Sequence, residues 1–230
     1  MKRLNINYSF VPFISCIALI LTFSACTSHP RKQANKEQDA AEFEDWTLLS
    51  DGQSLEGWDI TNFGPQGPVY VSGGNIILEM GDPITGITWK EDFPVTNYEV
   101  QLEAKKVTGN DFFCGMTFPV GKSFCSLIVG GWSGPVVGLS SVDGLDATEN
   151  ETRNLRKFEP GTWYKIRLRV TPEKIEAWID NEQVVNLLTA GRELSIRPEV
   201  NLSRPFGIAS WRTTAALRNI MMKELTGSDG

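Results

Sequence analysis

An alternation of apolar and polar residues between Trp163 and Val170 constrains the fold of this chain more than any other feature of its sequence. A period of two is that of a β-strand with one face buried and the other exposed to solvent. We therefore predict a strand here, with every second side chain facing a core. The predicted core-facing residues are Tyr164, Ile166, Leu168 and Val170.

Two more strands are expected directly after this one. Pro172 ends the first strand, because proline has no amide proton to donate to a sheet. A second alternation covers residues 175–179, and Asp180-Asn181 then provides a turn, since both residue types tolerate positive φ. Residues 184–188 form the return strand. Three consecutive antiparallel strands need further strands to cover their apolar face.

Short apolar segments separated by turn residues supply these neighbours. The chain has 12 prolines and 21 glycines, and it lacks long amphipathic helical patterns. Further strands are expected within residues 46–49, 69–80, 85–90, 97–107, 112–118, 124–129, 135–141, 206–211 and 216–225. Many short strands at near-regular spacing indicate an all-β protein with two packed antiparallel sheets, a β-sandwich.

The first 25 residues are predicted to be a targeting segment. Lys2 and Arg3 precede a short apolar run over residues 11–23, and small residues then precede Cys26. This pattern resembles a bacterial lipoprotein signal with Cys26 as the lipidated residue, although Phe23 stands where leucine is usual. An ordinary secretory signal or a membrane anchor is the alternative. In each case the domain lies outside the cytoplasm, in the periplasm or at the cell surface if Cys26 is lipidated.

The remaining chain divides into a tether and a domain. Residues 26–44 are polar and charged and are expected to be a flexible tether, and residues 45–226 form the domain. The net charge of −6 falls to −8 if the chain is cut before Cys26, and no basic stripe is present, which argues against nucleic acid as a partner. The single histidine, His29, lies in the tether, so a histidine-based triad inside the domain is excluded.

Several segments resemble one known family in order along the chain. They are WTLLSDGQSLEGW (46–58), YVSGGNIIL (70–78), NYEVQLEAKK (97–106), WYKIRLRV (163–170), IDNEQV (179–184), GIASW (207–211) and LRNIMMKEL (217–225). Together these segments resemble the 3-keto-disaccharide hydrolase family. The resemblance implies a concanavalin A-like jelly roll and a hydrolase acting on glycosides oxidised at the 3-position. Many members have Gln-x-His-Gly where residues 209–214 here contain no histidine, so the family's catalytic residues do not transfer.

Three aspartates are candidates for proton transfer in a glycoside hydrolase. Asp111 lies at a loop-to-strand junction, a common place for functional residues, and a purely turn-forming role is the alternative. Asp143 and Asp146 belong to an acidic loop, residues 142–151, that also contains two glutamates. Such a loop suits Ca²⁺, but its spacing matches no known calcium loop, so a solvated acidic loop is favoured and no metal or other cofactor is expected.

Aromatic and basic side chains are candidates for binding a carbohydrate. Trp132 lies between glycines, so its ring is either exposed and able to stack on a sugar or covered as part of a core. Trp211 and Arg212 occupy the region of the family's histidine and are expected to face the same groove. Arg156, Lys157 and Arg197 could bind hydroxyl or carboxylate groups, although charged residues are usually only solvated.

Cys114 and Cys125 lie on the two strands of a predicted hairpin. A loop of Pro119-Val120, or of residues 118–121, would place them opposite each other, where cysteines can form a disulfide. An exported protein permits this bond, whereas a three-residue loop would leave two buried thiols. The disulfide is therefore predicted, with two buried thiols as the open alternative.

Two functions remain open, with a third behind them. The first is an exported enzyme that processes glycosides, and the second is a non-catalytic glycan-binding module with the same fold, since jelly rolls host both. In both cases the partner is a carbohydrate, and a lipid anchor would attach the protein to the membrane. The third is a protein-interaction domain at the cell surface.

Overall fold

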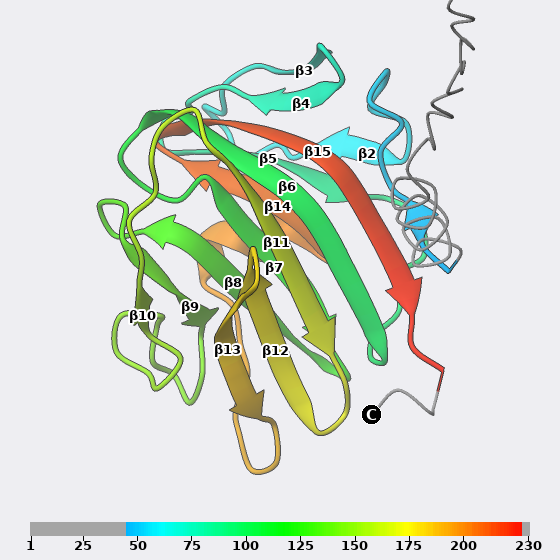
Figure 1. Ribbon diagram of the computed structural model, residues 1–230, viewed down its shortest axis with the longest axis vertical. Helices are drawn as coiled ribbons and strands as arrows, with labels where there is room; N and C mark the ends of the chain where they lie inside the picture. Colours follow the sequence, from blue (N-terminus) through cyan, green and yellow to red (C-terminus); the bar gives the residue numbers. More distant parts are fainter. Residues whose placement is uncertain (1–44, 227–230) are drawn as a thin grey trace, which may run out of the picture. The chain divides into compact units, whose positions relative to one another are not determined.

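The alternating stretch near residue 170 forms three consecutive antiparallel strands, as expected. They are β11 (Trp163–Val170), β12 (Lys174–Ile179) and β13 (Glu182–Leu188). The computed structural model describes residues 45–226, and within them these strands form one end of the larger of two sheets (Figure 1). Asp180 adopts a φ of 57° at the turn between β12 and β13, the left-handed conformation that its short polar side chain tolerates.

The larger sheet has the strand order β13-β12-β11-β6-β15-β4-β3, and β1 also pairs with β15. Its longest strands lie side by side at the centre (Figure 1). The bounds are β6 (Tyr98–Gly109), β15 (Thr213–Glu224), β4 (Asn75–Leu78), β3 (Val69–Ser72) and β1 (Thr47–Leu48). All neighbouring strands are antiparallel, as predicted.

The second sheet has the strand order β10-β9-β8-β7-β14-β5-β2 and is also antiparallel. The bounds are β10 (Asn154–Leu155), β9 (Val136–Ser140), β8 (Ser123–Gly131), β7 (Cys114–Val120), β14 (Phe206–Trp211), β5 (Ile84–Trp89) and β2 (Trp58–Ile60). A short 3₁₀ helix, η1 (Pro198–Ser203), precedes β14. No helix within residues 45–226 is long and apolar enough to cross a membrane.

The main core lies between the two sheets and follows the alternation in the sequence. Ile166, Leu168 and Val170 are fully buried, and Tyr164 is nearly so. On β6 every second side chain is likewise buried, at Tyr98, Val100, Leu102 and Ala104. The prediction of an all-β, two-sheet antiparallel sandwich is therefore confirmed, and so is the core-facing side of β11.

The predicted disulfide between Cys114 and Cys125 is wrong. Both cysteines are free and buried, and burial raises the pKa of each thiol to about 12. The hairpin turns at Gly121-Lys122, which places Cys114 opposite Val129 and Cys125 opposite Phe118. The two cysteines are thus four positions apart along the hairpin, about 13 Å, which is too far for a bridge.

The outer face of the second sheet is covered by connecting segments rather than by another sheet. Gly207 on this face has no side chain, which lets η1 pack closely against β14. A Cβ at residue 207 would lie 2.7 Å from the carbonyl oxygen of Ser203 in η1. A second, smaller apolar cluster forms on this face, comprising Ile84, Phe112, Ile128, Val200 and Ala209. The face between the covering segments contains the cavity described next.

Candidate functional site

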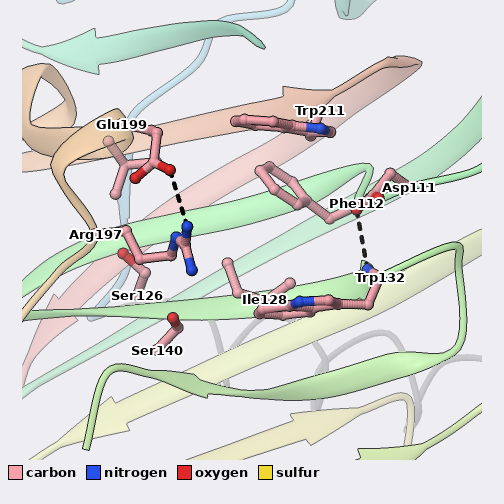
Figure 2. A pocket seen from close by; sticks show the side chains of 10 residues that line it. Asp111, Phe112, Ser126, Ile128, Trp132, Ser140, Arg197, Glu199 and Trp211 are labelled. Atoms are coloured by element: carbon pink, nitrogen blue, oxygen red, sulfur yellow. Dashed lines mark hydrogen bonds and ion pairs between the residues drawn. The ribbon is translucent and has the colours of Figure 1, made fainter. Parts of the chain in front are cut away.

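A cavity of about 240 Å³ opens on the outer face of the second sheet (Figure 2). Strands β8, β9 and β14, η1 and the loops that precede β7 and follow β8 contribute to it. Its lining residues are Asp111, Phe112, Ser126, Ile128, Trp132, Ser140, Arg197, Glu199, Val200 and Trp211. These positions are distant in the sequence and meet because β9, β8, β7 and β14 are neighbours in the sheet.

Aromatic rings form the walls of the cavity at one end. Figure 2 shows the indole rings of Trp132 and Trp211 on opposite sides, with Phe112 between them at this end. The ring centroids of Phe112 and Trp211 are 6.1 Å apart with an interplanar angle of 40°. Phe112 can lie against the sheet because Gly115 has no side chain; a Cβ there would be 2.8 Å from its ring. Flat apolar walls of this kind suit the faces of a sugar ring.

Asp111 holds the loop that presents Trp132. Its Oδ1 atom accepts hydrogen bonds from the backbone amides of Phe112 (2.8 Å) and Trp132 (3.1 Å), and its Oδ2 atom accepts one from the amide of Ser133 (3.3 Å). Trp132 and Ser133 both have positive φ, 48° and 69°, a conformation that costs energy for residues other than glycine. The three hydrogen bonds stabilise this conformation and so fix the direction of the Trp132 ring.

An ion pair lies at the other end of the cavity. The Nη2 atom of Arg197 donates to Glu199 Oε1 at 2.9 Å, and its Nη1 atom is 3.5 Å from Asp146 Oδ2. The hydrogen bond from Arg197 holds the pKa of Glu199 below its usual value, with a backbone amide as a second cause. Glu199 is therefore ionised at neutral pH and can act as a proton acceptor but not as a proton donor.

The structure brings three of the predicted site residues together. Asp111, Trp132 and Trp211 all line the cavity. Asp146 does not line the cavity: its Oδ1 atom accepts hydrogen bonds from the amide and hydroxyl of Thr148, and its Oδ2 atom faces the lining residue Arg197. Arg212 does not join them, because its guanidinium lies 3.9 Å from Asp82 beside a separate surface hollow.

Asp143 is also absent from the cavity lining. Its carboxylate accepts hydrogen bonds from the amide of Glu193 and from Arg192, which lower its pKa in that order of importance. Arg192 also pairs with Glu151, so this acidic loop is tied to the segment that follows β13. Within residues 45–226 no three potential metal-binding side chains of His, Cys, Asp or Glu lie together.

Among the other lining residues, the sequence pattern pointed to Arg197 but not to Phe112, Ser126, Ser140 or Glu199. A signal for Ser126 was available: on β8 the core-facing residues are Cys125, Leu127 and Val129, so Ser126 and Ile128 must face outward. Nothing in the local sequence shows that η1 lies over this face, because that contact joins segments about 70 residues apart.

The antiparallel two-sheet topology places the protein in the class of concanavalin A-like jelly rolls. The sequence profile of one family, described as the 3-keto-alpha-glucoside-1,2-lyase-like domain (3keto-disac_hyd), matches residues 45–223. The chain belongs to this family, which confirms the resemblance seen in its segments. No curated protein matches the sequence.

Solved structures with the same fold support the class. One is a protein from Parabacteroides distasonis provisionally assigned as a glycosyl hydrolase, with 15% identity and a TM-score of 0.54 over 83% of this chain and 97% of that one. Another is domain 4 of the arabinanase AbnA from Geobacillus stearothermophilus in complex with arabinotriose, with 13% identity and a TM-score of 0.52 over 79% and 93%. A third is the carbohydrate-binding module CBM66 from Bacillus subtilis, with 12% identity and a TM-score of 0.50 over 77% and 100%. At these identities the likeness establishes the fold alone.

Proposed function

We propose that this domain binds a glycoside in the cavity between Trp132 and Trp211 and cleaves it as a 3-keto-glycoside. The observation that carries the proposal is one cavity with tryptophans on opposite sides of one end and an arginine–carboxylate pair at the other. Membership of a family described by its activity on 3-keto-α-glucosides supports this substrate class. The arabinotriose complex of a protein with the same fold supports a carbohydrate partner.

Glu199 is the best candidate for the proton-transfer step. Two carboxylates line the cavity. Both oxygens of Asp111 accept hydrogen bonds from the backbone amides of other residues, whereas the carboxylate of Glu199 is held by the Arg197 side chain and by its own backbone amide. A ketone at C3 makes the hydrogen on C2 acidic. Glu199 would accept that proton while the C1–C2 double bond forms. As the C1–oxygen bond breaks, the leaving alkoxide would take a proton from water, and Glu199 would then pass its proton to the hydroxide so formed. The Arg197 guanidinium would stabilise the negative charge that develops on the keto oxygen.

Turnover of a 3-keto-glycoside by matched variants tests the enzyme proposal. Glu199→Gln should lower kcat by about 10²- to 10⁴-fold, as loss of a general base typically does. Glu193→Gln changes an exposed glutamate of the same segment outside the cavity and should leave kcat unchanged. Equal rates for the wild type and Glu199→Gln would rule out Glu199 as the base.

A non-catalytic glycan-binding module is the second candidate. It is favoured by the absence of histidine from residues 45–226 and by the structural use of Asp111. In that case no glycoside is turned over, while calorimetry detects binding that Trp132→Ala and Trp211→Ala each abolish. If a broad panel shows neither turnover nor binding, a surface that binds another protein is the function that remains.

We further propose that the protein is exported and anchored to a membrane through lipid on Cys26. The support is the sequence pattern before Cys26, which lies outside the described residues. Mass spectrometry of membrane-extracted protein should find a mature chain that begins at a lipidated Cys26. Cys26→Ser should prevent lipidation, and an intact N-terminus in the wild type would refute the proposal.

A further inference from the structure

A row of hydroxyl groups crosses the sheet at the base of the cavity. Thr117 on β7 faces Ser126 on β8, and Ser126 faces Ser140 on β9. All three side chains belong to residues that are at most 2% exposed. The hydroxyl oxygens of Thr117 and Ser126 are 2.9 Å apart and form a hydrogen bond, which gives each hydroxyl one partner. The row therefore ends at Ser140.

Within residues 45–226 the hydroxyl of Ser140 has no hydrogen-bond partner. Leaving a buried polar group unpaired costs about 1–3 kcal/mol, so such a group needs an explanation. Ser140 lines the cavity, and Figure 2 shows its oxygen pointing toward the end where the Arg197 guanidinium lies. A molecule in the cavity is thus in a position to supply the missing hydrogen bond.

Arg197 narrows the kind of atom that fits beside Ser140. A guanidinium has five N–H donors and no acceptor. Glu199 pairs with Nη2 of this guanidinium and Asp146 lies near Nη1. Within residues 45–226 its other N–H groups therefore remain able to donate. A serine hydroxyl can donate as well. An oxygen between these two residues can accept a hydrogen bond from each with its two lone pairs. A ketone or carboxylate oxygen does so without a proton that needs a further acceptor, whereas a hydroxyl carries such a proton.

We propose that Ser140 and Arg197 form a subsite for an acceptor-only oxygen of the bound glycoside, a ketone or carboxylate oxygen, and that Ser140 determines specificity for it. The inference rests on the proposed function, because it concerns the same cavity. It adds a residue and an orientation: the apolar faces of the sugar lie toward Trp132 and Trp211, and the acceptor oxygen lies toward β9. A ketone and a carboxylate share this chemistry, so the test includes both.

Calorimetric titration of the full-length protein with three ligands tests the subsite. The ligands are methyl α-glucoside, its 3-keto derivative and methyl α-glucuronide, and KM replaces Kd for any ligand that is turned over. The wild type should bind one of the last two more tightly than methyl α-glucoside. Ser140→Ala should lower the affinity for that ligand by a factor of about 5–30, which corresponds to about one or two kcal/mol. The same variant should change the affinity for methyl α-glucoside less than twofold.

Ser210→Ala is the matched control. Ser210 is also 1% exposed with an unpartnered hydroxyl within the described chain, yet it is absent from the cavity lining. It should leave all three affinities unchanged, and thermal unfolding should show that both variants fold. Equal losses for all ligands in Ser140→Ala, or no loss, would overturn the subsite while leaving glycoside binding intact. A wild type that binds none of the three would overturn the proposed function together with the subsite.

Discussion

Asp111 illustrates how a carboxylate in a cavity wall can have a structural role. Both of its oxygens accept hydrogen bonds from backbone amides, and its own amide donates to the hydroxyl of Thr213 at 3.1 Å. The Thr213 hydroxyl in turn donates to the Asp111 carbonyl at 3.1 Å. Asp111 therefore connects the start of β15 to the loop that holds Trp132, and its influence on a ligand is exerted through that ring.

Replacing Asp111 by asparagine should destabilise the fold. The asparagine amide nitrogen is a donor and would face a backbone donor, so at least one amide loses its acceptor at a cost of about 1–3 kcal/mol. Urea unfolding measures this, with Asp92→Asn, an exposed aspartate, as a control expected to stay within about 0.5 kcal/mol of the wild type. Unchanged stability combined with lost turnover would instead assign Asp111 a direct chemical role.

The protonation of Glu199 should depend on Arg197. The hydrogen bond from Arg197 is the largest cause of the lowered pKa of Glu199, whose usual value is 4.5. The contribution of this ion pair to stability is thus fully present above pH 4.5 and is lost as the pH falls through the lower folded pKa. NMR titration of the Glu199 side-chain carboxyl should show its pKa rising toward 4.5 in Arg197→Gln.

Arg192→Gln gives the reciprocal control for that titration. Arg192 pairs with Asp143, and after the Glu193 amide its hydrogen bond is the next cause that lowers the Asp143 pKa. This variant should raise the pKa of Asp143 and leave that of Glu199 unchanged. A Glu199 pKa that responds equally to both substitutions would mean that the two ion pairs are not independent.

At the scale of single elements, β11 has two chemically distinct faces. Leu168 is fully buried between the sheets. The side chains of Lys165, Arg167 and Arg169 point to the opposite face of the strand and are half-buried or exposed. Arg167, on the polar face, stacks on Trp178 of β12, with its guanidinium carbon 3.8 Å from the ring centroid. The strand thus contributes apolar area to the core on one side and cation–π contacts on the other.

Truncation on the two faces of β11 should have unequal costs. Leu168→Ala removes buried methyl groups and leaves a cavity, so it should lower the free energy of unfolding by about 2–5 kcal/mol. Lys165→Ala changes an exposed side chain on the same strand and should cost less than about 0.5 kcal/mol. Chemical denaturation of both variants measures the difference, and similar costs would contradict the assignment of the faces.

At the scale of the whole domain, the cavity depends on segments that cover the second sheet. The helix η1 contributes Glu199 and Val200 to the cavity, and the residue before it contributes Arg197. The Thr88 hydroxyl of β5 donates a hydrogen bond to the Leu202 carbonyl of η1 at 3.0 Å. This covering requires Gly207 on β14, because a Cβ there would lie 2.7 Å from the Ser203 carbonyl. The main core, by contrast, lies on the opposite face of the same sheet.

Gly207→Ala should therefore damage the cavity from a distance. The added methyl group meets backbone atoms of Ser203 and Ile87 within 3 Å, so η1 has to move, at a cost of about 1–3 kcal/mol for overpacking. Because η1 and its N-terminal flank contribute Arg197 and Glu199, glycoside affinity should fall as well, although residue 207 does not line the cavity. Calorimetry and thermal unfolding measure the two effects, and full affinity in a destabilised variant would mean that η1 does not position the ion pair.

The strands and the faces of the sheets follow from the sequence alone, because side-chain parity along a strand is a local property. The alternation of Tyr164 to Val170 and of Tyr98 to Ala104 predicts both strands and both buried faces. Family membership follows from segments spread over most of the domain. The sequence also predicts three of the cavity residues as site residues. Asp111 lies at a loop-to-strand junction, Trp132 lies between glycines, and Trp211 occupies the region of the family's histidine.

Register and long-range contact were decided only by the tertiary structure. The local pattern left several hairpin loops open, and the turn at Gly121-Lys122 separates Cys114 from Cys125 by four positions. Arg212 turned away from the cavity because it lies one residue beyond the end of β14, with a φ of 42°. Ser140 and Glu199 line the same cavity because η1 packs on the sheet. That packing joins residues distant in the chain and depends on the shapes of both surfaces.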